Sequence, residues 1–151
     1  MRKQTRRKVY NLVNPIQFAM VGAATLPRKT LNDLRLKELA ALDAMTKGQG
    51  TVSDWAILVD CMNLCEVMGK NGIGPEVLPV CEKVQETLHK AALHYEKTKR
   101  MVLDGPGIQA IRDLLEYADL QQASIPRSDF EKMIQKTINI TRTGQNVVRI
   151  Q

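Results

Sequence analysis

Three cysteines and two histidines are the residues of this chain best suited to binding a metal or attacking a substrate. Cys61 and Cys65 are four residues apart, so on a helix their thiols face one point. Cys81 and His89, from the next helix that we expect, could complete a tetrahedral zinc site. Each cysteine also falls on an apolar helical stripe, where a free cysteine acts as a small hydrophobic residue. We therefore interpret all three as buried core thiols and expect no bound metal.

The two histidines and a glycine-rich segment give no stronger indication of a metal site or a phosphate-binding site. His89 and His94 are five residues apart, which is roughly 140° around a helix and unfavourable for chelating one ion. The spacing of Gly69, Gly72 and Gly74 resembles part of a phosphate-binding loop. The Gly-Lys-Ser/Thr ending and the preceding strand of such loops are missing, so we interpret the segment as a connection between two helices.

Carboxylates are numerous, but they fall singly on expected helix faces. Asp113, Glu116 and Asp119 are spaced by three residues, and Glu82 and Glu86 by four. Such groups usually form a solvated face, and acid–base or nucleophilic catalysis would need a partner motif that the sequence lacks. The sequence therefore predicts a protein that is not an enzyme and that needs no cofactor.

The composition indicates helices that pack through aliphatic side chains. Of 151 residues, 44% are hydrophobic and only 4% aromatic, a balance that favours helices over a β-sandwich. Sustained two-residue alternation, the mark of a strand, is missing. We predict a single all-α domain, a compact bundle of five or six helices. Residues 1–8 form a flexible, disordered basic arm, residues 9–140 the helical domain and residues 141–151 a loose polar tail.

Caps and helix-breaking residues divide this domain into its helices. The expected segments are 15–24, opened by Asn14-Pro15; 31–45, capped by Thr30 and ended by Gly48; 53–68; 76–101, opened by Pro75; 108–123; and a helix that begins at the capping box Ser128–Glu131. The apolar stripe of the second segment comprises Leu31, Leu34, Leu39, Leu42 and Met45. In the tail, Val147, Val148 and Ile150 are able to dock on the domain or pair as a short strand.

Two of these helices have distinctive apolar patterns. The helix from 53 to 68 carries two apolar stripes, which predicts burial on more than one side and a central position. The next helix carries a heptad seam over nearly three repeats: Val77, Cys81, Val84, Leu88, Ala91 and Tyr95. We expect the seam to pack within the chain, while a homodimer through residues 77–95 stays open as the alternative.

Charge is distributed unevenly along the chain, whose formal net charge is +6. Residues 1–32 contain seven bases and no acid, and residues 132–151 contain four bases and no acid. The stretch between them holds all 16 acids and 11 bases. A slightly acidic body with two basic ends predicts a polyanionic partner, because lysine and arginine displace counterions from nucleic-acid phosphates.

The sequence predicts a protein of the bacterial cytoplasm that does not act at a membrane. No apolar run approaches the roughly 20 residues of a membrane span. The apolar stretch from Val9 to Leu26 has the outline of a signal peptide, but polar residues and a proline interrupt it. An odd number of cysteines on apolar positions is typical of reduced thiols in a cytoplasmic protein.

Several segments, taken together, resemble a family of small uncharacterised proteins carried by phages and prophages of proteobacteria. The residues that carry the resemblance are Arg6-Arg7-Lys8, Asn14-Pro15-Ile16, Leu39-Ala40-Ala41, Asp54-Trp55, Leu58-Val59-Asp60, Asn63-Leu64-Cys65-Glu66, Gly72-Ile73-Gly74-Pro75-Glu76 and Tyr95-Glu96. The resemblance spans much of residues 1–140 and brings no catalytic or binding residue with it. It implies a phage accessory protein that acts in the cytoplasm of a bacterial host.

Two functions follow from the charge pattern and this setting. The first is binding of nucleic acid, DNA or RNA, or of a host nucleoprotein complex, through the basic ends. The residues expected to contact phosphates are Arg2, Lys3, Arg6, Arg7, Lys8, Arg28 and Lys29. The alternative is inhibition of a host defence or transcription complex, in the manner of an anti-CRISPR protein, through the acidic face of the body. A helix-turn-helix within 107–138 would add base recognition, but its second helix is not rich in base-reading side chains.

Overall fold

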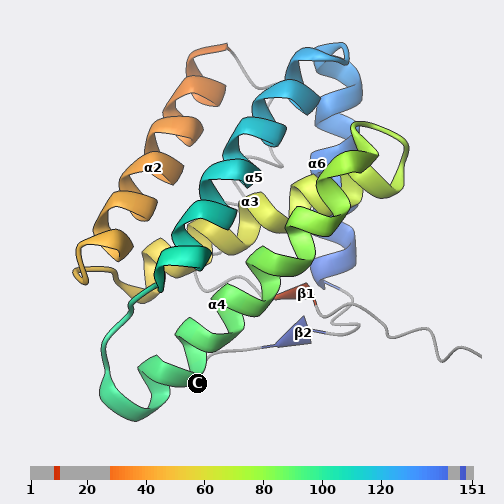
Figure 1. Ribbon diagram of the computed structural model, residues 1–151. Helices are drawn as coiled ribbons and strands as arrows, with labels where there is room; N and C mark the ends of the chain where they lie inside the picture. Colours follow the sequence, from red (N-terminus) through yellow and green to blue (C-terminus); the bar gives the residue numbers. More distant parts are fainter. Residues whose placement is uncertain (1–8, 11–27, 143–146, 149–151) are drawn as a thin grey trace, which may run out of the picture.

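The protein folds as a bundle of helices, as the sequence predicts (Figure 1). The computed structural model describes residues 9–10, 28–142 and 147–148, and the side chains of 32–141. Within these ranges the elements are β1 (Val9–Tyr10), α2 (Arg28–Thr46), α3 (Val52–Lys70), a 3-10 turn (Pro75–Val77), α4 (Leu78–Thr98), α5 (Gly105–Ala123), α6 (Arg127–Arg142) and β2 (Val147–Val148). The helix expected over 15–24 lies outside the described residues.

Helix α3 is the centre of the bundle, which confirms the prediction from its two apolar stripes. It contacts α2, α4, α5 and α6, and it crosses behind α4 and α5 in Figure 1. Its buried residues run from Trp55 to Gly69 and lie on all sides of the helix. Because the helix is enclosed all round, its hydrophobicity has no preferred direction.

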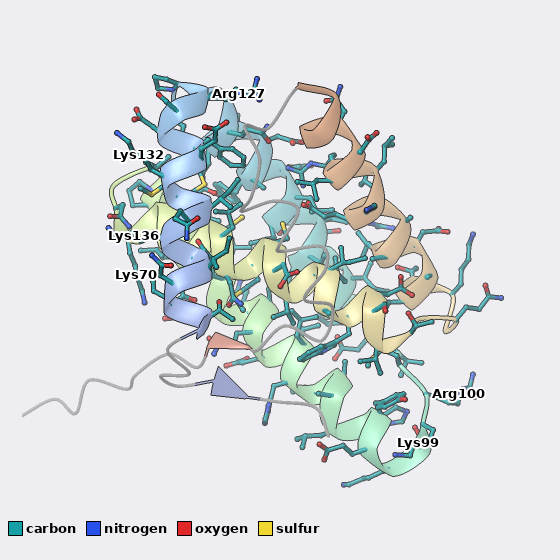
Figure 2. The ribbon with its side chains drawn as sticks, turned by 180° about the vertical axis from the view of Figure 1, so that it is seen from behind. Lys70, Lys99, Arg100, Arg127, Lys132 and Lys136 are labelled. Carbon is teal, nitrogen blue, oxygen red and sulfur yellow. The ribbon has the colours of Figure 1, made fainter. Side chains whose placement is uncertain are left out.

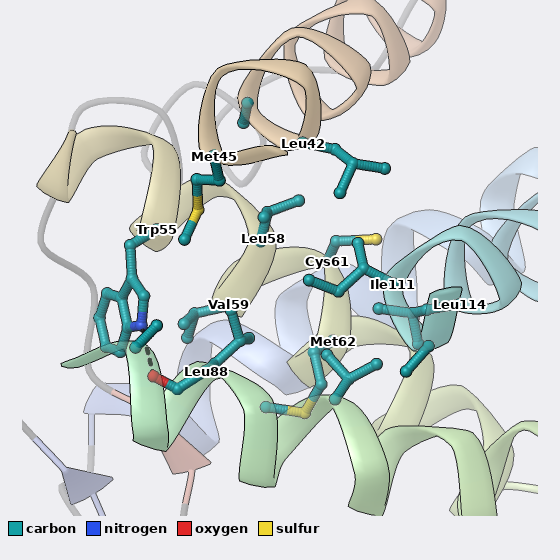
Figure 3. Packing of buried hydrophobic residues seen from close by; sticks show 14 of the residues in the cluster. Leu42, Met45, Trp55, Leu58, Val59, Cys61, Met62, Leu88, Ile111 and Leu114 are labelled. Atoms are coloured by element: carbon teal, nitrogen blue, oxygen red, sulfur yellow. Dashed lines mark hydrogen bonds between the residues drawn. The ribbon is translucent and has the colours of Figure 1, made fainter. Parts of the chain in front are cut away.

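The main core lies where α3 meets α2, α4 and α5 (Figure 3). Trp55 is fully buried there, and its indole N–H donates to the backbone carbonyl of Leu88 at 2.9 Å. This bond satisfies the one polar atom that the ring takes into the core. Around the ring and along α3 lie further buried side chains, among them Met45, Leu58, Val59, Met62, Ile111 and Leu114. A second, smaller cluster joins Met68 of α3 to Phe130, Ile134 and Ile138 of α6.

The heptad seam of α4 is buried inside this chain. Val77, Cys81, Val84 and Leu88 are each fully enclosed, and Tyr95 is half-buried against the same core. The covering helices are α3 and α5 of the same chain. The packing therefore corresponds to the intramolecular alternative, and Tyr95 is the seam residue that stays partly exposed.

Several helices begin or end at residues other than those predicted from the sequence, because other residues make their terminal hydrogen bonds. The predicted capping box at Ser128 is wrong, because α6 begins at Arg127 and the amide of Phe130 donates to the carbonyl of Pro126. Helix α2 begins at Arg28, so Thr30 lies inside its first turn and is not its cap. The helix expected over 76–101 is a 3-10 turn followed by α4, which ends at Thr98.

The capping box that does form belongs to α3. The Thr51 hydroxyl accepts from the amide of Asp54, and the Asp54 carboxylate accepts from the amide of Thr51. Replacement of Thr51 by alanine leaves an orphan amide at the start of the central helix, and we expect a loss of about 1 kcal/mol in the free energy of unfolding. Urea unfolding followed by circular dichroism measures this loss. Ser53→Ala, two residues later on an exposed position, is the control and should change stability little.

One short strand pair tethers the two ends of the chain. Val9 and Tyr10 pair in parallel with Val147 and Val148, so the strand that we considered possible for the tail does form. Helix α6 continues to Arg142 and buries Thr141, which places the tail boundary later than residue 141. No helix within the described ranges has the length and apolar character needed to cross a bilayer.

Candidate functional site

The strand pair brings the two basic ends of the chain to one corner of the bundle. Strand β1 contacts both α3 and α6, and it pairs with β2 in the register Val9 to Val147. Lys8 directly precedes β1 in the sequence, and Arg149 directly follows β2. The two acid-free segments, more than a hundred residues apart in the chain, are therefore attached to the same corner.

The outer face of α6 adds exposed positive charge to this corner. Phe130, Ile134 and Ile138 hold the inner face of α6 in the smaller core cluster. That packing turns positions three and four residues apart toward solvent. The exposed stripe is Lys132, Gln135, Lys136 and Asn139. Two of these are ammonium groups, and two are amides able to donate and accept hydrogen bonds.

Lys70, at the end of α3, extends the stripe (Figure 2). Lys132, Lys136 and Lys70 follow one another along α6 in this view, toward the end of the helix that β1 and β2 occupy. The Lys136 ammonium donates to the side-chain carbonyl of Asn71 at 2.7 Å. Beside these groups lies a hollow of about 80 Å³ between α3 and α6, lined in part by Lys70, Asn71 and Thr137.

Two lysines of the stripe have acidic neighbours. Lys132 lies 4.0 Å from Asp129, in an exposed pair. Lys70 lies 2.8 Å from the buried Glu66 carboxylate and keeps 55% of its side chain exposed. The exposed Lys132–Asp129 pair contributes little free energy, so a phosphate can compete for Lys132. Lys70 stays paired with the buried Glu66, because loss of that partner would leave a buried carboxylate uncompensated. We call Lys70, Lys132 and Lys136, with the segments joined to β1 and β2, the basic corner.

The residues predicted from the sequence to contact phosphates form two groups. Arg2, Lys3, Arg6, Arg7 and Lys8 lie outside the described residues. The backbone of Arg28 and Lys29 opens α2, at the end of the bundle opposite β1 in Figure 1. The structure thus joins α6, and not the start of α2, to the segment that leads into β1. Charge counting placed Lys132 and Lys136 in a basic end but did not name them as phosphate contacts, because only the packing shows which face of α6 is exposed.

Cys61 and Cys81 are placed unfavourably for nucleophilic attack or metal binding. Hydrogen bonding with Cys65, burial and the neighbouring Glu38 carboxylate raise the pKa of Cys61 well above that of an ordinary thiol. A thiol held in its protonated form is a poor nucleophile and a poor metal ligand. Cys81 is buried in the α4 seam. Among residues 32–141, no group of three or more His, Cys, Asp or Glu side chains gathers as a metal ion would require.

The glycine-rich connection after α3 uses its amides to end that helix. The amides of Asn71, Gly72 and Ile73 donate to carbonyls of the last turn of α3. Gly74 has a φ of +57° and packs so closely that an added Cβ would come 2.9 Å from the Gln121 side chain. The segment is therefore a tight connection between two helices, as predicted from the sequence. Its hydrogen-bonded amides do not form a phosphate cradle.

The acidic positions considered for the alternative function are partly engaged within the chain. Asp119 accepts from Arg35 at 2.7–2.9 Å, and Asp113 accepts from Gln109 at 2.9 Å. Glu116 on α5 and Glu86 on α4 are exposed. Asp113, Glu116 and Asp119 of α5 therefore present less uncompensated negative charge to a partner than their sequence spacing indicates.

Comparison of the chain with protein-family models, with curated proteins and with solved structures gives no match. The chain's own residues and their geometry are therefore the grounds on which a function is proposed.

Proposed function

We propose that this protein binds nucleic acid, alone or within a nucleoprotein complex, through the basic corner. The observation that carries the proposal is the parallel pairing of β1 with β2. It ties together two acid-free basic segments, while all 16 acids fall in the sequence between them, residues 33–131. A concentrated positive region on an acidic body both attracts a polyanion and orients it on approach.

The chemistry of the corner suits contact with a phosphate backbone. Lys132 and Lys136 are one helical turn apart on an exposed face, so both can reach phosphates of one strand. Gln135 and Asn139 lie between and beyond them and bond to each other at 3.1 Å. Amide side chains on such a face can exchange that bond for the edge of a base, and adenine is their usual partner. Lysines position a protein on nucleic acid, whereas such amides supply selectivity.

The setting that we propose is that of a non-enzymatic accessory protein of a phage or prophage, acting in the host cytoplasm. This setting rests on the family resemblance of the sequence. Binding through lysine and arginine side chains requires no cofactor. Such binding also does not involve the buried thiols or the α4 seam, which belong to the core.

Salt-dependent binding tests this proposal on the full-length protein. We expect fluorescently labelled random-sequence DNA or RNA to bind with an affinity that falls steeply as the salt concentration rises. Replacing both Lys132 and Lys136 with glutamine should lower the slope of log affinity against log salt by about 1.8 for duplex DNA, since each lost phosphate contact removes about 0.9. Neutralising the five bases between residues 2 and 8 should lower it further.

The matched control is replacement of Lys83 and Lys90 by glutamine, which removes two exposed lysines from α4. We expect this control to leave the slope unchanged. Equal loss in both double variants would mean that only net charge matters, and no salt-dependent binding by the wild type would overturn the proposal. A pull-down from host lysate, with and without nuclease, covers the alternative. One near-stoichiometric protein that survives nuclease would favour an inhibitor of a host complex.

A further inference from the structure

A cavity of about 60 Å³ lies between α2, α3, α5 and α6, away from the basic corner's lysines. Its walls are mostly apolar and include Leu34, Ile57, Leu64, Phe130 and Ile134. A single water needs roughly 15 Å³ by such a measure, so the space holds several waters or a small molecule of a few heavy atoms.

Asp60 places a carboxylate in this cavity without a partner. The residue is 7% exposed, in the middle of the central helix. Neither carboxylate oxygen has a hydrogen-bond partner among the residues that the structure describes. An unpaired carboxylate in a buried site is costly, so its presence needs an explanation, and a bound partner is one such explanation. The carboxylate is therefore the strongest unmet acceptor of the described core.

Gln121 of α5 supplies a second acceptor to the same cavity. Its side-chain nitrogen donates to the backbone carbonyls of Cys65 at 3.2 Å and Ile73 at 2.8 Å. Both donor positions of the amide are thus used, and these bonds fix its orientation. Its oxygen is buried without a partner, and the residue as a whole is 2% exposed.

Two of the donors around the cavity, Arg35 and Thr137, are engaged elsewhere. Arg35 is bonded to Glu38 and to Asp119, and the Thr137 hydroxyl donates to the carbonyl of Met133 at 2.8 Å. The lining therefore offers unmatched acceptors, one of them a carboxyl group that becomes negatively charged when it loses its proton. An occupant that satisfies them must donate several hydrogen bonds and carry positive charge.

We propose that this cavity binds a small organic cation, a primary ammonium with a short alkyl chain. The three N–H groups of the ammonium match the two Asp60 oxygens and the Gln121 oxygen in number. The alkyl chain matches the apolar walls. An anion would meet the carboxylates of Asp60 and Glu38, and a hydrated metal would need more oxygen ligands than the cavity presents.

The electrostatics of the cavity agree with a cationic occupant. Burial, followed by the neighbouring Glu38 carboxylate, raises the pKa of Asp60 well above its ordinary value. The groups that face it are Glu38 and Arg35 of α2 and the Cys61 thiol of α3, while the described lining from α5 and α6 is uncharged. A bound ammonium displaces the proton of Asp60, so binding should strengthen as pH rises through the pKa of this carboxyl.

Isothermal titration calorimetry with n-propylammonium chloride tests the proposal on the full-length protein. We expect one saturable site with a dissociation constant in the millimolar range or below, as suits a ligand of four heavy atoms. The neutral analogue 1-propanol, of the same size, and the anion propionate, one heavy atom larger, should bind at least about tenfold more weakly. This comparison uses only the wild-type protein.

Asp60→Asn keeps the shape of the side chain and removes its charge. We expect it to weaken n-propylammonium binding by at least about tenfold, while Asp33→Asn, which removes the same charge from an exposed position of α2, leaves binding unchanged. The absence of saturable binding up to about 100 mM, equal binding of 1-propanol, or unchanged affinity in Asp60→Asn would each overturn the proposal.

Discussion

Replacement of Trp55 by alanine lowers the free energy of unfolding by about 4 kcal/mol, near the upper end for a single truncation in a core. The side chain is fully buried on the central helix. Its loss leaves a cavity between α3 and α4 and removes the indole hydrogen bond to Leu88. Because α3 contacts every other described α-helix, the neighbours cannot collapse into that space without disturbing the whole bundle.

Urea unfolding of the purified variants measures this loss. Trp55→Phe keeps one aromatic ring but removes the N–H donor and part of the ring volume, so we expect an intermediate loss of about 2 kcal/mol. Leu36→Ala truncates a leucine that is 63% exposed on α2, and it should change stability by less than about 0.5 kcal/mol. A loss below about 1 kcal/mol for Trp55→Ala would contradict the packing at the centre of the bundle.

The helices were predictable because their apolar periodicity is local. The two stripes of α3 and the seam of α4 each fit within one helix, and burial in the structure follows both patterns. The prediction of exposed faces and helix ends failed where the sequence was compatible with two similar alternatives. Leu39 continues the apolar stripe of α2 but is 47% exposed, because that stripe is wider than the face that α3 covers. Ser128 is a good capping residue, yet the carbonyl of Pro126 accepts the first bond of α6.

The candidate sites depend on contacts between distant residues, which periodicity does not reveal. The pairing of Val9 with Val147 joins the ends of the chain, and hydrophobic spacing carries no information about such a partner. The sequence places Asp60 on α3, the helix predicted to be buried on more than one side. It does not reveal that the Asp60 carboxylate lacks a hydrogen-bond partner. Charge counting found the basic ends, and only the packing of α6 shows that Lys132 and Lys136 share an exposed face.

Replacement of Asp60 by leucine raises the free energy of unfolding by about 2 kcal/mol at neutral pH, because it removes a buried carboxylate without a partner and keeps a branched side chain of similar shape. The gain should depend on pH. The pKa of Asp60 is raised in the folded protein, so its contribution favours folding below the unfolded pKa of about 3.9 and is lost as pH rises toward the folded pKa. Glu38 also has a pKa raised by burial. Because Glu38 and Asp60 repel each other when both are charged, the Glu38 contribution cancels only in part, and what remains adds to the growth of the difference with pH.

Urea unfolding at several pH values between about 4 and 8 measures the difference in stability between Asp60→Leu and the wild type, which should grow as pH rises. Asp33→Asn, on an exposed position, should show a small difference at every pH. Lower stability of Asp60→Leu than of the wild type, or a difference independent of pH, would contradict an unpartnered carboxylate at this position. Added n-propylammonium should narrow the gap at neutral pH, because a ligand that binds only the folded wild type stabilises only the wild type. A variant that is more stable and yet cannot bind the cation would show that Asp60 is retained for binding and not for folding.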